Sequence, residues 1–152
     1  MMLDKKGLLW IGTTNGLRSY DGYTVHDYRS LVINSQQLPS STVNCMAEGN
    51  EDLLWVGTRD GLVCLDRRTG EWHTVRLPGE NQRVIYCLSV TADGCVWVGT
   101  DGGLTCYDPK SKRLHDFDGD KMPAIDSKGQ RHHLGYYSVK SILDDKKGNL
   151  FI

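Results

Sequence analysis

The sequence predicts an all-β fold, a β-propeller fragment of about three four-stranded blades. Three observations lead to this prediction. A six-residue motif of apolar residues, Trp, Gly and Thr occurs at 8–13, 53–58 and 95–100, and a fourth copy begins at 149. Its aromatic positions are 45, 42 and 54 residues apart, close to the period of roughly 40–50 residues of propeller blades. Each complete motif is followed by a Gly-containing turn pair and a second apolar run.

Each repeat contains segments typical of four strands. Asn-Gly, Asp-Gly or Gly-Gly follows the motif, and these dipeptides join two strands in tight hairpins. A short apolar run precedes the second, third and fourth motifs, and another run follows each hairpin. With strands named A to D from the hub outward, the predicted units are blade 1 with strands B to D over 4–28, blade 2 over 43–77, blade 3 over 84–117 and the start of blade 4 over 139–152.

The two ends of the sequence lie at almost the same phase of a blade. Residues 4–11 and 145–152 are identical at six of eight positions. A propeller removes its exposed edges by closing a ring of about 4–8 blades, and three blades are too few to close. We therefore expect a fragment of a longer protein, whose end faces are covered by the remaining blades of the parent chain or by a second copy in a homodimer.

Composition and charge exclude several classes of partner. The 18 Lys and Arg and the 19 Asp and Glu are interleaved and give a net charge of −1. A nucleic-acid binder needs excess cations to displace the counterions of phosphates, so no nucleic acid is expected to bind this segment. No apolar run reaches the roughly 18–20 residues of a membrane helix, and the start lacks the apolar core of a signal peptide.

A fuller pattern, Gly-x-Leu-Trp-Ile-Gly-Thr-x-x-Gly-Leu-x-x-Tyr-Asp, at 7–21, 52–66 and 94–108, resembles the two-component regulator propeller repeat. Such repeats build the periplasmic sensor region of hybrid two-component histidine kinases of Bacteroides type, typically as seven-bladed propellers. The resemblance implies a periplasmic segment that senses an oligosaccharide or another small glycan-derived ligand. It also implies signal transduction through a membrane helix to a histidine kinase and to transcription regulation.

The aromatic residues of the motif have two possible roles. They could stack against a sugar, or they could fill the space between adjacent blades. Because a large flat side chain occupies the same position of every strand B, packing between blades is favoured. A buried Trp typically contributes about 3–5 kcal/mol by the cost of its replacement with Ala. The predicted packing residues are Trp10, Trp55, Trp97 and Phe151.

Four of the five cysteines occupy two repeat-equivalent positions, and the other copies place Ser141 and Ser19 there. These four are Cys45 with Cys87 and Cys64 with Cys106. Such positions require a small side chain that can be buried, a requirement that free Cys meets. Cys95 lies two residues before a motif Trp, and no CxxC occurs, so a disulfide or zinc site is disfavoured.

Two other repeated features also have structural interpretations. The glycine of each Gly-Thr pair is expected to allow two backbones to approach closely at the end of a strand. Asp21, Asp66 and Asp108 each begin a turn, where a carboxylate can accept backbone N–H groups. An acid present in every blade is therefore a poor candidate for catalysis.

Function is expected among the residues that do not repeat. The three connections from strand D to strand A differ in length and span 29–42, 78–83 and 118–137. The third gathers a cation, two imidazoles and two phenols, a set suited to hydrogen bonding and stacking against a sugar. These candidate ligand-binding residues are Arg131, His132, His133, Tyr136 and Tyr137. The alternative interpretation is a solvated loop whose two tyrosines enter the next strand A.

Neither a metal nor a cofactor is predicted, and no catalytic residues are identified. The segment 116–127 begins like a calcium loop, but Lys121 and Ser127 stand where that loop needs Gly and Glu. No Ser/His/Asp arrangement or HExxH stretch is visible. The sequence thus favours a binding segment without catalysis. Two alternatives stay open, a propeller scaffold that binds a protein and an enzyme that resembles the streptogramin lyases, another propeller family.

Overall fold

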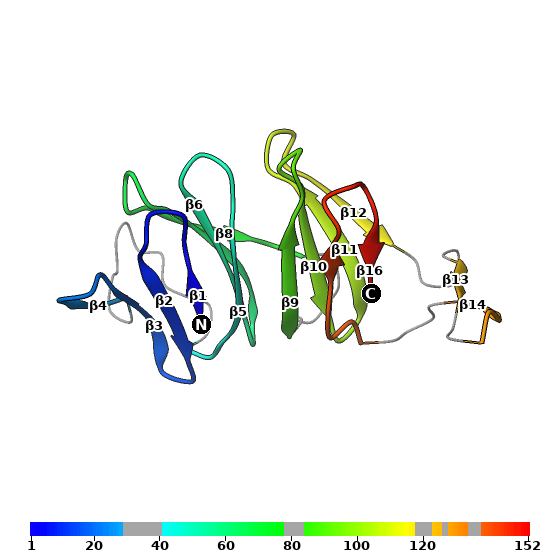
Figure 1. Cartoon of the computed structure of the whole chain (residues 1–152), viewed down its shortest axis with the longest axis horizontal. Coiled ribbons are helices and arrows are strands. Elements are labelled where there is room, and N and C mark those ends of the chain that lie inside the picture. Colours follow the sequence, from blue (N-terminus) through cyan, green and yellow to red (C-terminus); the bar gives the residue numbers. More distant parts are fainter. Residues whose placement is uncertain (29–40, 78–83, 118–122, 126–127, 134–137) are drawn as a thin grey trace.

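The computed structural model (Figure 1) describes residues 1–28, 41–77, 84–117, 123–125, 128–133 and 138–152. Within these ranges the chain forms strands and turns and no helix. Three sheets have four antiparallel strands each, arranged in chain order. The first contains β1 (Met2–Leu3), β2 (Leu9–Thr13), β3 (Gly16–Tyr20) and β4 (Val25–Asp27). The second contains β5 (Val43–Glu48), β6 (Leu53–Thr58), β7 (Gly61–Asp66) and β8 (Trp72–Val75). The third contains β9 (Ile85–Val90), β10 (Val96–Thr100), β11 (Gly103–Asp108) and β12 (Arg113–Phe117).

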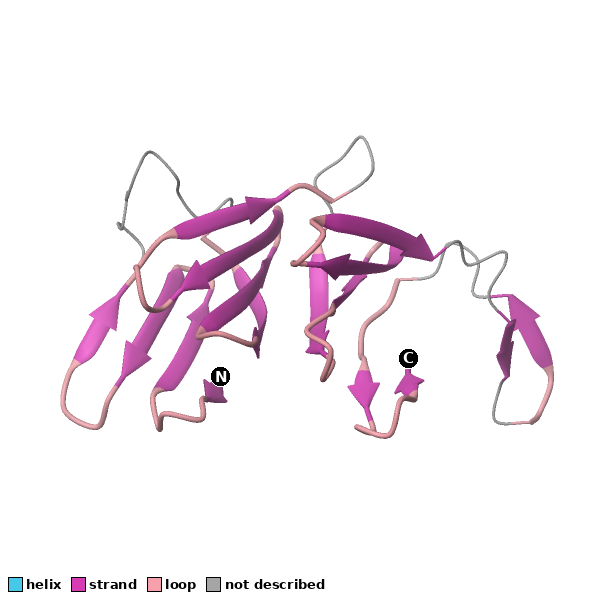
Figure 2. Cartoon of the chain, turned by 90° about the horizontal axis from the view of Figure 1, so that it is seen from above, coloured by secondary structure: helices cyan, strands magenta, loops and turns pink. Residues whose placement is uncertain are grey.

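Four further strands form two hairpins. One joins β13 (Pro123–Ile125) to β14 (Arg131–His133), and it stands apart from the sheets in both views (Figures 1 and 2). The other joins β15 (Leu143–Asp144) to β16 (Leu150–Phe151). These sheets confirm the all-β propeller architecture predicted from the sequence.

The Gly-Thr pair at the end of each strand B stabilises the turn that follows. The threonine hydroxyl donates a hydrogen bond to the carbonyl oxygen three residues later, at 2.9 Å for Thr13, 2.8 Å for Thr58 and 3.1 Å for Thr100. Thr58 and Thr100 are fully buried. Their hydroxyls therefore need this partner, because an unbonded buried hydroxyl costs free energy.

Apolar side chains fill the space between successive sheets. The interface between the first and second sheets is called the first seam here. In it, Trp10 packs against the face of the second sheet that is turned toward the first. The cluster comprises Trp10, Leu17, Val43, Leu54, Val56, Val63, Leu65 and Trp72. Between the second and third sheets, the second seam, Trp55 packs in the same way. Its cluster comprises Trp55, Leu62, Cys64, Ile85, Val96 and Val98.

The motif glycines are required by the closeness of these sheets. A Cβ at Gly12 would lie 2.5 Å from a methyl carbon of Val43, and one at Gly57 would lie 2.5 Å from a methyl carbon of Ile85. At Gly99 the corresponding Cβ would meet Val139. Each glycine thus lies against the first residue of the next strand A or of its equivalent, and a close approach at the end of the strand was expected from the sequence.

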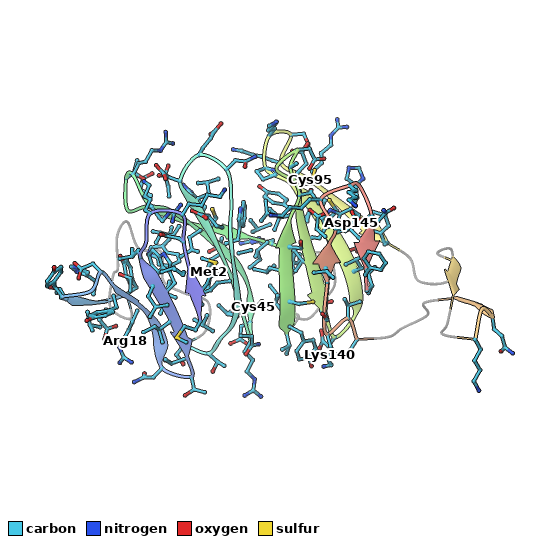
Figure 3. The ribbon with its side chains drawn as sticks, in the orientation of Figure 1. Met2, Arg18, Cys45, Cys95, Lys140 and Asp145 are labelled. Atoms are coloured by element: carbon cyan, nitrogen blue, oxygen red, sulfur yellow. The ribbon has the colours of Figure 1, made fainter. Side chains whose placement is uncertain are left out.

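The segment before β15 is held against the third sheet. The Val139 amide donates to the Thr100 carbonyl at 2.9 Å, and the Lys140 ammonium lies 3.0 Å from the centre of the Tyr86 ring. Figure 3 labels Lys140 at the end of the sheets opposite to Cys95 and Asp145. The fourth unit therefore begins at the same place relative to its predecessor as the second and third.

The structure differs from the sequence-based expectation at three places. A two-residue strand, β1, occupies the place of strand A in the first sheet by pairing with Leu9 and Trp10. The run 139–143 was predicted as a strand, but pairing begins only at Leu143, because its partner β16 offers two residues. The segment 118–137, expected as a loop, contains the hairpin β13–β14. Its three residue pairs have no counterpart in the other repeats, so the repeat pattern does not predict them.

Substituting Gly57 with Ala is expected to lower the free energy of unfolding by about 2 kcal/mol, since the added methyl overlaps Cys45 and Ile85 and packed cores resist overpacking. Urea unfolding measures the change. Gly148→Ala serves as the control, because nothing lies within 4 Å of its Cβ position and only its φ of +99° opposes the change. A Gly57→Ala effect no larger than that of the control would contradict the close approach.

Candidate functional site

Antiparallel strands place the turns of each sheet at two opposite rims. The A–B and C–D turns lie at one, here called the A–B rim, and the B–C turns and D–A connections lie at the other. The site predicted from the sequence belongs to the third D–A connection. Most of the D–A connections lie outside the described residues, namely 29–40, 78–83, 118–122, 126–127 and 134–137.

Of the five predicted ligand-binding residues, the structure places three on one strand. Arg131, His132 and His133 form β14, opposite Ile125, Ala124 and Pro123 of β13 respectively. Tyr136 and Tyr137 lie outside the described residues. The β13–β14 hairpin that contains these three residues stands apart from the packed sheets (Figure 2).

The A–B rim of the first seam carries a charged cluster that the sequence analysis did not identify. It is called the Arg67 cluster here and consists of Asp4, Lys6, Glu48, Asp52 and Arg67. The side chains of Arg67 and Asp4 are only 8% and 1% exposed. Such ions require partners, because an unpaired buried charge is strongly unfavourable.

Arg67 connects the first sheet to the second. Its guanidinium donates to Asp4 Oδ2 at 2.5 Å, to Glu48 Oε1 at 2.9 Å and through Nε to the Asp52 carbonyl at 3.0 Å. The Lys6 ammonium adds an ion pair with Asp52 at 2.7 Å. The Arg67–Asp4 and Lys6–Asp52 pairs cross the seam, whereas the bonds from Arg67 to Glu48 and to the Asp52 carbonyl hold Arg67 within the second sheet.

Asp4 also holds its own turn and the seam tryptophan. Its Oδ1 accepts the Lys6 and Leu8 amides at 2.9 Å each, and its Oδ2 accepts the Trp10 indole N–H at 3.0 Å. Burial is the largest influence on the Asp4 pKa and raises it. The bonds from Trp10, Leu8 and Lys6 and the charge of Arg67 together outweigh burial, so the pKa lies below 3.8.

Asp52 occupies a backbone position that suits glycine. Its φ is +65°, and the repeat-equivalent residues Gly7, Gly94 and Gly148 have φ values of +82°, +93° and +99°. A non-glycine residue in this region is strained. The ion pair with Lys6 and the contact with Arg67 account for the aspartate, and the Lys6 hydrogen bond is the main cause of its lowered pKa.

Each seam has a pocket at this rim, next to its tryptophan. The first-seam pocket has a volume of about 210 Å³ and is lined by Asp4, Lys6, Leu8, Trp10, Tyr28, Leu65, Arg67 and Gly70. The second-seam pocket has a volume of about 300 Å³ and is lined by Asn50, Glu51, Leu53, Trp55, Gly94, Pro109 and Lys110. By repeat position, Gly49 and Pro109 of the second seam replace Asp4 and Arg67 of the first. The second pocket therefore lacks the internal ion pair.

The four predicted packing aromatics have different surroundings. Trp10 and Trp55 are 1% and 3% exposed, so neither offers a face on which a sugar could stack. Trp97 is half-buried and stacks on Phe117, with ring centres 4.9 Å apart. Phe151 is 58% exposed, since no described sheet lies beyond β16. A packing role for Phe151 therefore stays a prediction.

All five cysteines are free. Burial is the main cause that raises the pKa of Cys45, Cys64 and Cys106 to about 12. Thiols of this kind are poor nucleophiles near neutral pH. Packing is the role that their surroundings support, since Cys45 lies against the motif glycine of its sheet.

The repeated turn aspartates accept hydrogen bonds as predicted. Asp21 accepts the amides of Tyr23 and Thr24, and Asp66 accepts those of Arg68 and Thr69. Asp108 accepts the Lys110 amide and the Ser111 hydroxyl. Hydrogen bonds are the largest cause of the lowered pKa at each position, led by Thr24 for Asp21, Arg68 for Asp66 and Ser111 for Asp108.

Among the described residues, no group of three or more His, Cys, Asp or Glu is arranged to hold a metal ion. The described part of the chain also contains no helix long and apolar enough to span a membrane.

Comparison with known proteins supports the repeat. The family model described as two component regulator propeller matches residues 37–60 and 79–102. No curated protein matches the chain at a significant level. An extracellular domain of a putative hybrid two component system from B. thetaiotaomicron is similar, with 17% identity, a TM-score of 0.74, and coverage of 98% of this chain and 21% of that chain.

Two further structures share the fold. The extracellular domain of a putative one component system from B. thetaiotaomicron has 23% identity and a TM-score of 0.71, with coverage of 97% of this chain and 19% of that one. A catalytically inactive virginiamycin B lyase from Staphylococcus aureus, with quinupristin, has 14% identity and a TM-score of 0.60, with coverage of 84% and 45%. These identities establish the fold alone. The chain spans about a fifth of the length of the two extracellular domains.

Arg67→Ala is expected to lower the free energy of unfolding by about 3 kcal/mol, because it leaves the buried Asp4 carboxylate without its cation. The double variant Asp4→Asn/Arg67→Met should recover at least about 1 kcal/mol of this loss. Arg68→Ala is the matched control, since that side chain is 60% exposed, and should change stability by less than about 0.5 kcal/mol. Equal effects of Arg67→Ala and Arg68→Ala in urea unfolding would argue against the cluster.

The lowered pKa of Asp4 predicts a loss of stability in acid. The folded pKa lies below the ordinary value of 3.8, so the ionised carboxylate favours the folded state. Its contribution is complete above about pH 4 and disappears as the pH falls through the folded pKa. Urea midpoints measured from pH 6 to pH 2.5 should therefore decline less steeply for Asp4→Asn than for the unaltered chain. Parallel curves would show that Asp4 does not contribute.

Proposed function

We propose that the chain, whose residues 37–60 and 79–102 match the family model described as two component regulator propeller, is a segment of the ligand-sensing propeller of a hybrid two-component histidine kinase. The observation that carries the proposal is the repeat itself, which the family model matches twice and which builds seam-packed sheets. We place the segment in the periplasm. Its fold is shared with extracellular domains from B. thetaiotaomicron, and this likeness supports that location.

The proposed ligand is an oligosaccharide or another small glycan-derived molecule. Its proposed contacts are Arg131, His132 and His133 of β14, followed by Tyr136 and Tyr137. The β13–β14 hairpin supports this assignment because it interrupts the repeat and stands apart from the packed sheets (Figure 1). Guanidinium, imidazole and phenol groups offer hydrogen bonds to hydroxyl groups and an anchor for an acidic substituent.

The proposed mechanism depends on rigid sheets. The seams pack each sheet against the next, so the sheets keep their relative positions while a ligand binds. Differential affinity of the ligand for two arrangements of paired sensors then shifts the equilibrium between them. In the parent protein this shift reaches the kinase across the membrane and alters transcription.

Screening of oligosaccharides by thermal shift, followed by calorimetric titration, tests the proposal. For an oligosaccharide that binds, Arg131→Ala is expected to raise the Kd about tenfold, since the variant removes charged hydrogen bonds to the ligand. Arg113→Ala is the matched control, because that exposed arginine of β12 belongs to the repeat. Binding unaltered by Arg131→Ala, or the absence of binding to every oligosaccharide, would contradict the proposal. Capture of a protein partner instead would favour the scaffold alternative.

A further inference from the structure

The two seam pockets differ in the hydrogen-bond acceptor available to the indole N–H of their tryptophan. In the first seam the Trp10 indole N–H donates to Asp4 Oδ2 at 3.0 Å. In the second seam Gly49 stands at the position of Asp4, and a Cβ there would lie 2.7 Å from Trp55 Nε1. The side chain that accepts the indole proton in the first seam therefore has no counterpart in the second.

Trp55 lines the second-seam pocket, and its indole N–H has no hydrogen-bond partner among the described residues. Trp55 is 3% exposed and lines the pocket, and its Nε1 makes no hydrogen bond within the described part of the chain. No described polar side-chain atom is both sealed from solvent and unbonded. Because Trp55 lines the pocket, an oxygen atom that enters it can accept this N–H.

The charges at the pocket are of both signs. Glu51 and Lys110 are exposed and line it from the A–B turn of the second sheet and the C–D turn of the third. Two other acids near the pocket are occupied by their own turns. Asp93 accepts the Thr91 hydroxyl at 2.6 Å and the Cys95 amide at 3.1 Å, and Asp108 accepts the Ser111 hydroxyl at 2.6 Å.

The first seam indicates which group fits the open donor. There a carboxylate accepts the indole N–H and pairs with a cation. In the second seam the indole N–H and a cation, Lys110, are present, but the position of the Asp4 carboxylate is taken by Gly49. An anion alone would meet Glu51, whereas a molecule that also carries an ammonium group would satisfy it. Leu53 and Pro109 add apolar walls to this arrangement.

We propose that the second-seam pocket binds a free α-amino acid with an apolar side chain. The carboxylate accepts the Trp55 indole N–H and pairs with Lys110, the ammonium pairs with Glu51, and the side chain packs against Leu53 and Pro109. The volume of about 300 Å³ is at the small end of ligand pockets and suits a molecule of this size. The pocket lies at the A–B rim, so the inference is independent of the glycan proposed for the β13–β14 hairpin.

The test follows the indole N–H signals of the ¹⁵N-labelled chain by NMR, with each of the four tryptophans assigned by its Phe variant. L-leucine is titrated to 20 mM at constant pH and ionic strength. The Trp55 signal is expected to shift and to saturate, and the Trp10 signal to stay in place because Asp4 already holds that proton. N-acetylleucine, which lacks the ammonium, and leucinamide, which lacks the carboxylate, should each bind at least fivefold more weakly.

Three variants test the assigned contacts. Lys110→Ala and Glu51→Gln change exposed side chains, are expected to leave the fold intact and should each raise the Kd for leucine at least threefold. Trp55→Phe keeps an aromatic ring in the seam and removes the indole N–H, so it should raise the Kd about tenfold, measured by calorimetry. Lys147→Ala, at an exposed lysine of the β15–β16 turn, is the control and should leave leucine binding unaltered.

Specific results would overturn the proposal. One is the absence of a saturable change at Trp55 up to 20 mM leucine. Equal binding of leucine, N-acetylleucine and leucinamide would show that the zwitterion is not recognised. Full leucine binding in both Lys110→Ala and Glu51→Gln would locate the amino acid elsewhere. Glycan binding at the hairpin is measured separately, so failure of one proposal leaves the other intact.

Discussion

The close approach of each sheet to the next is the constraint on which the structure depends. A flat indole near the start of strand B, with a glycine two residues later, creates a surface that accepts the first residue of the following strand A. At Gly12 and Gly57 the available space excludes even a methyl group. The indole supplies the area that excludes water from the seam, and the glycine allows the backbones to come together.

The seams share their apolar interior and differ at the A–B rim. Asp4, Trp10 and Arg67 form a buried ion pair with an indole bond in the first seam. The fourth unit has the repeat-equivalent Asp145, where Phe151 replaces the tryptophan and the Asn149 amide donates to the carboxylate at 2.7 Å instead. The second seam has neither carboxylate nor guanidinium at these positions. The repeated interior thus sets the fold, and each rim is free to acquire its own chemistry.

The two rims are suited to different tasks. The D–A connections vary in length and carry the hairpin that interrupts the repeat, whereas the short turns of the A–B rim are fixed by aspartate hydrogen bonds and by the Arg67 cluster. A binding group at the rim of the D–A connections is therefore supported by sheets that are packed against one another. A pocket at the A–B rim lies between two sheets, so a ligand bound there contacts both sheets and stabilises their arrangement.

The sequence alone determined the all-β fold, the strand order and the role of the motif glycines, because these follow from local turn chemistry and from a pattern repeated at a fixed period. Trp10 and Trp55 could be assigned to packing for the same reason. The Arg67 cluster and the open Trp55 indole N–H could not be found in this way. Asp4 and Arg67 are 63 residues apart, and only the stacking of one sheet on the next brings their side chains together. The hairpin at Arg131–His133 was likewise decided by tertiary structure, because its pairing with Pro123–Ile125 does not follow the repeat.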